Sequence, residues 1–176
     1  MIGLDRHVER WIVHHRVGWL DDIFVWLTRI GTYGAIWLLL ALLLAYAWRR
    51  PRIFLLVAAA DATADATSGI LKAVIGRDRP PLVYARPAPL VHDPATGAFP
   101  SGHAATSFAC ATVLAATWPR AAPAFFVLAA AIAFSRVYVG VHWPLDVIAG
   151  ALLGVAIALL LLVAVRWRSS RAPRRD

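Results

Sequence analysis

The sequence predicts an all-α protein, a polytopic membrane helix bundle of five to six transmembrane helices with an N-terminal amphipathic helix. Of its 176 residues, 60% are hydrophobic and 16% are charged, and the mean hydropathy is +0.65. Soluble domains carry about 25% charged residues. The apolar residues also gather in runs close to the length of about 20 residues that crosses a bilayer. Because no repeat or Gly/Ser-rich linker interrupts the chain, we expect a single domain over residues 1–176.

Residues 1–31 form the predicted N-terminal amphipathic region. Between residues 4 and 19, apolar side chains such as Trp11 and Val13 alternate with arginines and histidines, as in a helix that lies in the lipid headgroup layer. The alternative is a poorly hydrophobic sixth span. The segment has no continuous apolar stretch followed by a cleavage site, so we expect membrane insertion through the helices that follow.

Five apolar runs make up the predicted transmembrane bundle at 32–167. The first can also be read as one long helix that starts near Asp21, and the third is short. Trp48, Trp118, Trp143 and Trp167 near the span ends fit an interfacial aromatic belt. The runs cover residues 32–48, 53–75, 104–118, 121–139 and 145–167.

The formal net charge of +8 is distributed in the manner of membrane topology. With five spans, the loops 76–103 and 140–144 share one side. The loops 49–52 and 119–120 share the other side with the basic tail, 168–176, and this side carries nine arginines when Arg166 at the end of the last span is counted. The positive-inside rule makes that side cytoplasmic. We therefore expect an integral plasma membrane protein with a cytoplasmic C-terminus and no nucleic-acid partner.

The first cluster of functional side chains is Lys72 and Arg79, with Arg77 beside them. Lys72 is the only lysine of the chain and lies in the last turn of the second predicted span. A lysine and an arginine together suit a phosphoryl group, because the guanidinium matches its oxygens and the ammonium adds a point charge. The alternative is that both side chains reach lipid headgroups.

The second and third clusters flank other spans. Ser101 and Gly102 precede an apolar helix, where a capping serine and a bare backbone leave amides free to bind an anion, and His103 lies in the first turn. Arg136 ends the fourth span, and His142 follows it. Asp146, four residues after His142, can hold one imidazole nitrogen and leave the other free to attack. A capped helix with a satisfied histidine is the structural alternative.

The predicted order of spans places all three clusters on the same side of the membrane. Their pattern resembles the three-part motif of the type 2 phosphatidic acid phosphatase superfamily. Its parts are Lys72 with six residues to Arg79-Pro80, then Pro100-Ser101-Gly102-His103, then Ser135-Arg136 with five residues to His142 and three more to Asp146. The superfamily also contains vanadium haloperoxidases, and its membrane members usually have six spans.

This resemblance implies roles for individual residues. His142 would be the nucleophile that forms a phosphohistidine, Asp146 would orient it, and His103 would be the general acid. The phosphate oxygens would be held by Lys72, Arg79, Ser101, Gly102 and Arg136. No metal or other cofactor is implied, and the chain shows no acidic cluster of the kind that Mg²⁺ requires.

The expected function is a phosphatase for a lipid phosphate or diphosphate, with its site at the outer leaflet. Undecaprenyl or another polyprenyl diphosphate is the first candidate substrate; phosphatidylglycerophosphate, phosphatidic acid and a decaprenyl-linked sugar phosphate are alternatives. A vanadate-dependent haloperoxidase is disfavoured by the five apolar runs. A lipid-binding protein without activity is disfavoured by the presence of both His103 and His142. Asp61 and Asp65 lie outside the motif, and we expect them to have a structural role, with bonds to neighbouring helices through Thr63 and Thr67. The alternative is that Asp65 braces Lys72. With Cys110 as the one cysteine, no intrachain disulfide can form.

Overall fold

The computed structural model describes residues 2–92 and 95–171. Within these two ranges every regular element is helical, which confirms the all-α prediction. The elements in chain order are α1 Ile2–His14, α2 Gly18–Ile30, η1 Thr32–Gly34, α3 Ala35–Ala47, α4 Pro51–Ile75, α5 Pro80–Val83, α6 Gly102–Thr117, η2 Pro119–Ala121, α7 Ala122–Tyr138 and α8 Pro144–Arg171.

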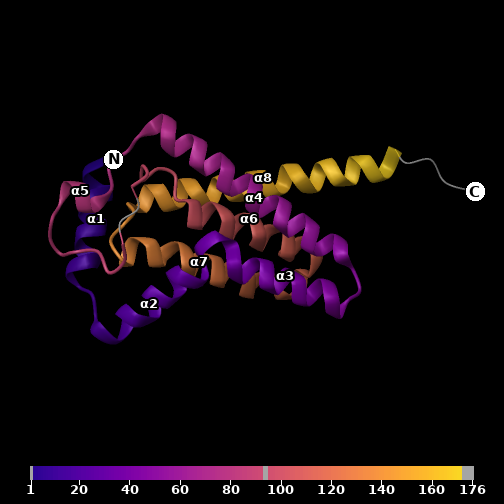
Figure 1. The fold of residues 1–176 in the computed structure, drawn as a ribbon, viewed down its shortest axis with the longest axis horizontal. Helices are drawn as coiled ribbons and strands as arrows, with labels where there is room; N and C mark the ends of the chain where they lie inside the picture. Colours follow the sequence, from indigo (N-terminus) through magenta and orange to yellow (C-terminus); the bar gives the residue numbers. More distant parts are fainter. Residues whose placement is uncertain (1, 93–94, 172–176) are drawn as a thin grey trace, which may run out of the picture.

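Helix α6 is the centre of the bundle and packs against α4, α7 and α8 (Figure 1). Its side chains are mostly small and buried, such as Ala105, Ala109 and Cys110. Small side chains let neighbouring helix backbones approach closely, which is how helices pack where lipid surrounds them. Gly150 and Gly154 of α8 face the start of α6, where a Cβ atom would come within 2.4 Å of Ser101 O, just before the helix, and within 2.1 Å of Ala105 O.

Three helical segments are long and apolar enough to cross a membrane: 51–83, 119–138 and 144–166. The pair α2 and η1–α3 makes a fourth if it is counted as one bent span. Helix α6, with 16 residues, is not among these segments. The apolar helices support a membrane bundle, and the number of five to six crossings stays a prediction.

The interpretation of residues 21–48 as one long helix is wrong. Helices α2 and α3 meet at an angle of 61°. The break is local, since Tyr33 and Gly34 have φ angles of 51° and 64°, in the left-handed region. At Gly34 there is also no room for a side chain, because a Cβ atom would lie 2.0 Å from the Oδ1 atom of Asp61 on α4. The break directs α2 away from the bundle axis.

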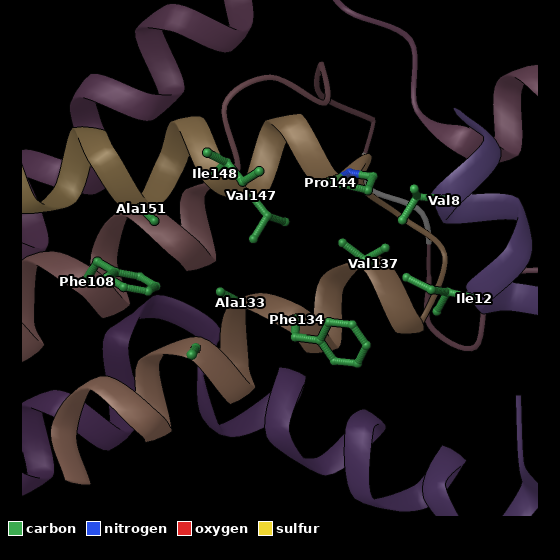
Figure 2. Close-up of a pocket in the computed structure, with 11 residues that line it drawn as sticks. Val8, Ile12, Phe108, Ala133, Phe134, Val137, Pro144, Val147, Ile148 and Ala151 are labelled. Atoms are coloured by element: carbon green, nitrogen blue, oxygen red, sulfur yellow. The ribbon is translucent and has the colours of Figure 1, made fainter. Parts of the chain in front are cut away.

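A helix does form in the N-terminal region, but it ends at His14, earlier than the predicted residue 19. Its buried face consists of Asp5, Glu9 and Val13, whereas Leu4 and Trp11 are more than half exposed. Other apolar residues of α1 line a hydrophobic cavity of about 310 Å³ between α1, α7 and α8 (Figure 2). Helix α1 therefore packs on the bundle through acidic as well as apolar side chains.

The loops that carry the predicted site lie together at the end of the molecule where α1 lies (Figure 1). Two hydrogen bonds between backbone atoms connect them, from Leu90 N to Val139 O and from Ser101 N to Asp146 O. The turns at 48–50 and 118–121 lie at the opposite end, toward which α8 extends. Of the predicted basic tail, residues 172–176 lie outside the described part of the chain.

Candidate active site

A cavity of about 610 Å³ opens between α2, η1, α4, α6, α7, the long connection before α6 and the short turn before α8. Six of the eight predicted site residues line it: Lys72, Arg79, Gly102, His103, Arg136 and His142. These come from segments up to 70 residues apart in the sequence. The structure thus brings the three clusters to one place, with cations, two imidazoles and the start of a helix around a common space.

His142 lies in the turn between α7 and α8, and its side chain is buried. Its Nδ1 atom is 3.3 Å from Oδ2 of Asp146, and its Nε2 atom is 3.2 Å from Nη1 of Arg79. If Nδ1 carries the proton, it donates to the carboxylate, and Nε2 accepts from the guanidinium. Burial, followed by the positive charges of Arg79, Arg136 and Lys72, lowers the pKa of His142 well below its ordinary value. The imidazole is therefore neutral at pH 7 and has a lone pair for attack.

Asp146 lies behind His142 and does not line the cavity. Because Pro144 starts α8, the carboxylate falls in the first turn, where its Oδ2 atom also accepts the backbone N–H of Trp143 at 2.9 Å. Its Oδ1 atom accepts from Nη1 of Arg77 at 2.5 Å. The predicted orienting role of Asp146 agrees with this geometry, and Arg77 is an additional partner.

Arg79 is fixed by the two connections that meet around it. Its Nε donates to Thr96 O and its Nη1 to Val141 O, both at 2.8 Å. The side chain is 2% exposed and still reaches the cavity. Backbone carbonyls thus hold the guanidinium in place before a phosphate arrives, and such preorganisation makes a charge effective in stabilising a transition state.

Arg136 is held from the other side of the cavity. Its Nη1 donates to Oγ1 of Thr28 at 2.7 Å, and this hydroxyl also lies 3.0 Å from Oγ of Ser135. Thr28 belongs to α2, so the segment before the break takes part in the site. Sequence reasoning missed this residue because no motif or spacing connects α2 with α7.

Gly102 lets Lys72 approach the start of α6. A Cβ atom at Gly102 would lie 3.0 Å from Nζ of Lys72 and 3.2 Å from Oγ of Ser68. Ser101 is the residue before the first helical position, as predicted, but it is fully buried and does not line the cavity. Among the described residues its Oγ atom has no hydrogen-bond partner, so it does not form the expected side-chain cap.

His103 lies where α6 meets α2 and η1. Its Nε2 atom is 3.2 Å from Thr28 O and 3.4 Å from Oγ1 of Thr32. These contacts place the imidazole on the side of the cavity formed by α2 and η1. Arg29, which lies between Thr28 and Thr32 in the sequence, also lines the cavity, and sequence reasoning assigned it no role in the site.

The two acidic residues of α4 separate in the structure. Asp61 is buried, and its Oδ1 atom lies 3.8 Å from Sγ of Cys110, which fits a structural role. Asp65 is exposed and lines the cavity near Lys72. Thr63 and Thr67 hydrogen-bond to carbonyls of their own helix, so they do not connect the acids to neighbouring helices.

The sequence model of the PAP2 superfamily matches residues 34–170. The chain belongs to the PAP2 superfamily. Among curated proteins it is 32% identical to an undecaprenyl-diphosphatase from Sulfolobus acidocaldarius, over 90% of this chain and 77% of the relative. It is 36% identical to a decaprenylphosphoryl-5-phosphoribose phosphatase from Mycobacterium tuberculosis, over 76% of this chain and 74% of the relative.

Solved structures of PAP2 proteins have the same fold. A phosphatidylglycerolphosphate phosphatase from Bacillus subtilis matches with a TM-score of 0.76 and 26% identity, over 99% of this chain and 88% of that one. This PAP2 protein is therefore an integral membrane enzyme that hydrolyses lipid phosphates, as its motif and apolar helices predicted.

Proposed function

We propose that this PAP2 protein hydrolyses a polyprenyl diphosphate, undecaprenyl diphosphate first, through a phosphohistidine and without a metal ion. The observation that carries the chemistry is the position of His142. It lies between the carboxylate of Asp146 and the guanidinium of Arg79, with its Nε2 atom on the side of the cavity. The undecaprenyl-diphosphatase and the decaprenyl-linked phosphatase among the relatives support a polyprenyl substrate.

The first step is attack of His142 Nε2 on the terminal phosphorus. A bond forms between nitrogen and phosphorus, and the bond from phosphorus to the bridging oxygen breaks. Asp146 stabilises the imidazolium that results, since its carboxylate accepts from Nδ1. Lys72, Arg79 and Arg136 balance the charge that develops on the equatorial oxygens, and the Gly102 amide, at the start of α6, adds a donor. Ser101, buried behind the cavity, contributes by shaping this helix start.

His103 acts on the leaving oxygen. The negative phosphate of the bound substrate favours protonation of His103. The imidazolium donates this proton to the bridging oxygen as the lipid departs, and in the second step the neutral imidazole removes a proton from the water that attacks the phosphohistidine. That step releases inorganic phosphate and restores His142. Among the described residues no three His, Cys, Asp or Glu side chains gather as they would around a metal, and the steps above require none.

Arg29 favours a diphosphate over a monophosphate. His103 indicates the side on which the leaving group departs, and Arg29 lies on the same wall, between Thr28 and Thr32 that contact His103. Within the described residues the guanidinium of Arg29 takes part in no ion pair or hydrogen bond. The leaving group of a diphosphate is a lipid monophosphate, whose negative charge suits this cation. The leaving group of a phosphomonoester is a neutral alcohol.

A phosphatidylglycerophosphate phosphatase is the second candidate, because the B. subtilis phosphatase is similar over nearly the whole chain. Phosphatidic acid is a third candidate substrate. For both lipids the leaving group is uncharged at the oxygen that departs, so neither needs Arg29.

We also propose that the site faces the outside and that the C-terminus is cytoplasmic. Arginines at the end opposite the site, Arg49, Arg50, Arg52, Arg120 and Arg166, support this orientation. Helix α1 then lies at the outer surface, with the exposed Leu4 and Trp11 in the headgroup layer.

The test is phosphate release from a polyprenyl diphosphate, phosphatidylglycerophosphate and phosphatidic acid by the protein in detergent. We expect the diphosphate to be hydrolysed fastest, with full activity in EDTA and inhibition by orthovanadate. His142→Ala should lose activity, whereas Arg52→Gln at the opposite end should keep it. Undiminished release by His142→Ala contradicts the assignment of the nucleophile, and loss of activity in EDTA contradicts the absence of a metal.

Arg29→Gln tests the choice of substrate. It should lower kcat/KM for the diphosphate about tenfold, the effect of about 1.4 kcal/mol, and leave kcat/KM for a monophosphate unchanged. An equal change for both substrates would show that Arg29 does not bind a leaving phosphate.

A further inference from the structure

Arg77 lies between two buried carboxylates behind the catalytic histidine. Its Nη1 atom donates to Oδ1 of Asp146 and its Nη2 atom to Oδ2 of Asp5, both at 2.5 Å. The two carboxylate side chains are 0% and 1% exposed, and that of Arg77 is 22% exposed. Asp5 belongs to α1, which lies outside the residues that match the PAP2 superfamily. The ion pairs therefore connect the N-terminal helix to the motif.

Asp5 also contacts the helix that carries Asp146. Its Oδ1 atom accepts the backbone N–H of Leu145 at 2.8 Å, in the first turn of α8. That N–H has no partner within the helix, so Asp5 acts as a capping residue supplied by another helix. Each oxygen of Asp5 thus has one partner, Leu145 or Arg77, and both partners lie next to Asp146 in space or in sequence.

Both carboxylate oxygens of Asp146 also accept hydrogen bonds. Its Oδ1 atom accepts from Arg77, and its Oδ2 atom faces Nδ1 of His142 and the backbone N–H of Trp143. The centroid of the Trp143 ring lies 5.7 Å from the Arg77 guanidinium, so the ring covers one face of this cation. With three donors on its two oxygens, the carboxylate has a fixed orientation, and so has the imidazole that it holds.

Arg77 does not act as a phosphate ligand. The sequence placed it next to Lys72 and Arg79 as a third cation for an anion, but it does not line the cavity that those two side chains share. Both of its terminal nitrogens donate to carboxylates. Its positive charge also offsets the negative charge of Asp146, which is otherwise costly to bury.

We propose that Asp5 and Arg77 are positioning residues that fix Asp146, and through it His142, so that helix α1 is part of the catalytic apparatus. This inference depends on the proposed function only in that His142 is the nucleophile. An ionised, correctly oriented Asp146 is needed when the imidazolium forms, and Arg77 maintains both conditions. Residues that orient a catalytic group in this way change the rate of the chemical step and leave substrate binding intact.

The experiment compares Arg77→Met, Arg77→Lys and Asp5→Asn with the wild-type protein in detergent. The substrate is whichever lipid phosphate the wild-type protein hydrolyses. We expect kcat to fall about 10–100-fold in Arg77→Met, with KM within about threefold, because partners of catalytic groups have effects of this size. Arg77→Lys should recover part of the loss. Asp5→Asn, which keeps the guanidinium beside Asp146, should lose less than Arg77→Met. Rapid-quench trapping should show slower formation of the phosphohistidine.

Two control variants distinguish this effect from a general change of charge. Asp22→Asn removes an exposed acid from α2, and Arg52→Gln removes an exposed arginine at the opposite end; both should keep kcat. Thermal unfolding of each variant allows kcat to be expressed per folded molecule. If Arg77→Met does not fold, Asp5→Asn and Arg77→Lys give the answer.

An unchanged kcat in these variants, or a rise of KM alone, would overturn the proposal. A loss of the same size in Arg77→Lys and Arg77→Met would also count against it, since the lysine keeps the charge. A wild-type protein that releases no phosphate from any lipid contradicts the proposed function and is recognised before the variants are compared.

Discussion

Replacement of Gly154 by alanine tests whether the contact between α6 and α8 holds the site together. In the structure, a Cβ atom at this position would lie 2.1 Å from Ala105 O and 2.9 Å from Ala109 N. Ordinary van der Waals contact begins near 3.4 Å. The obstructing atoms belong to the backbone of α6, so no side-chain rotation makes room, and the two helices must separate locally by about 1.3 Å.

The size of the effect follows from two opposing contributions. Insertion of a methyl group into a well-packed core costs about 1–3 kcal/mol, and a backbone contact belongs at the upper end of that range. The higher helix propensity of alanine than of glycine stabilises the folded state by about 1 kcal/mol. The expected net loss is about 2 kcal/mol, or about 4–8 °C in Tm for a chain of this size. Because α6 carries His103 and α8 carries Asp146, activity should fall as well.

Thermal unfolding in detergent, together with phosphate release below Tm, measures both effects. Gly69→Ala is the matched control, because this glycine is exposed on α4 and nothing lies within 4 Å of its added Cβ atom. The control should have an unchanged or higher Tm and full activity. A Gly154→Ala protein whose Tm and activity equal those of the control would refute the close packing of α6 and α8.

Three further predictions concern other parts of the molecule. Burial raises the pKa of Glu9 from 4.5 to about 7, so between these pH values the folded state keeps a proton that the unfolded state releases. The protein therefore loses up to about 3 kcal/mol of stability as the pH rises from 4.5 to 7. Glu9→Gln should abolish this loss in unfolding curves recorded between about pH 4.5 and 8. Gly102→Ala places a methyl group 3.0 Å from Nζ of Lys72 and should lower kcat/KM about 10–100-fold with little change in Tm, which kinetics and thermal unfolding would check together. A reporter fused after Asp176 should be active only in the cytoplasm, and an external signal would invert the proposed topology.

Loops and helix ends far apart in the sequence are coupled through a few polar contacts at the end of the molecule that carries the site. Arg79 is fixed by Thr96 and Val141, and Arg136 by Thr28. Each of these contacts joins two segments that no short motif connects. The cost of burying their polar groups is offset only when all segments are in place, so the site is assembled by the fold as a whole.

The helical class and the membrane character follow from composition and from the length of the apolar runs, which reflect the local requirement that a backbone in lipid satisfies its own hydrogen bonds. The three-part motif was also readable, because spacing along a helix or across a tight turn fixes neighbours such as His142 and Asp146. Counting spans placed the three clusters at one end, where the structure has them.

Contacts between segments that have no fixed spacing in the sequence could not be predicted, because the tertiary structure decides them. The break at Gly31–Gly34, the burial of Ser101 and the position of Arg77 between Asp5 and Asp146 all arise from helices meeting at particular angles. A sequence pattern specifies which side chains share a helix face, but the partner across a helix interface depends on packing of all the helices together. For this reason the charge of Arg77 was readable in the sequence, whereas its two carboxylate partners were not.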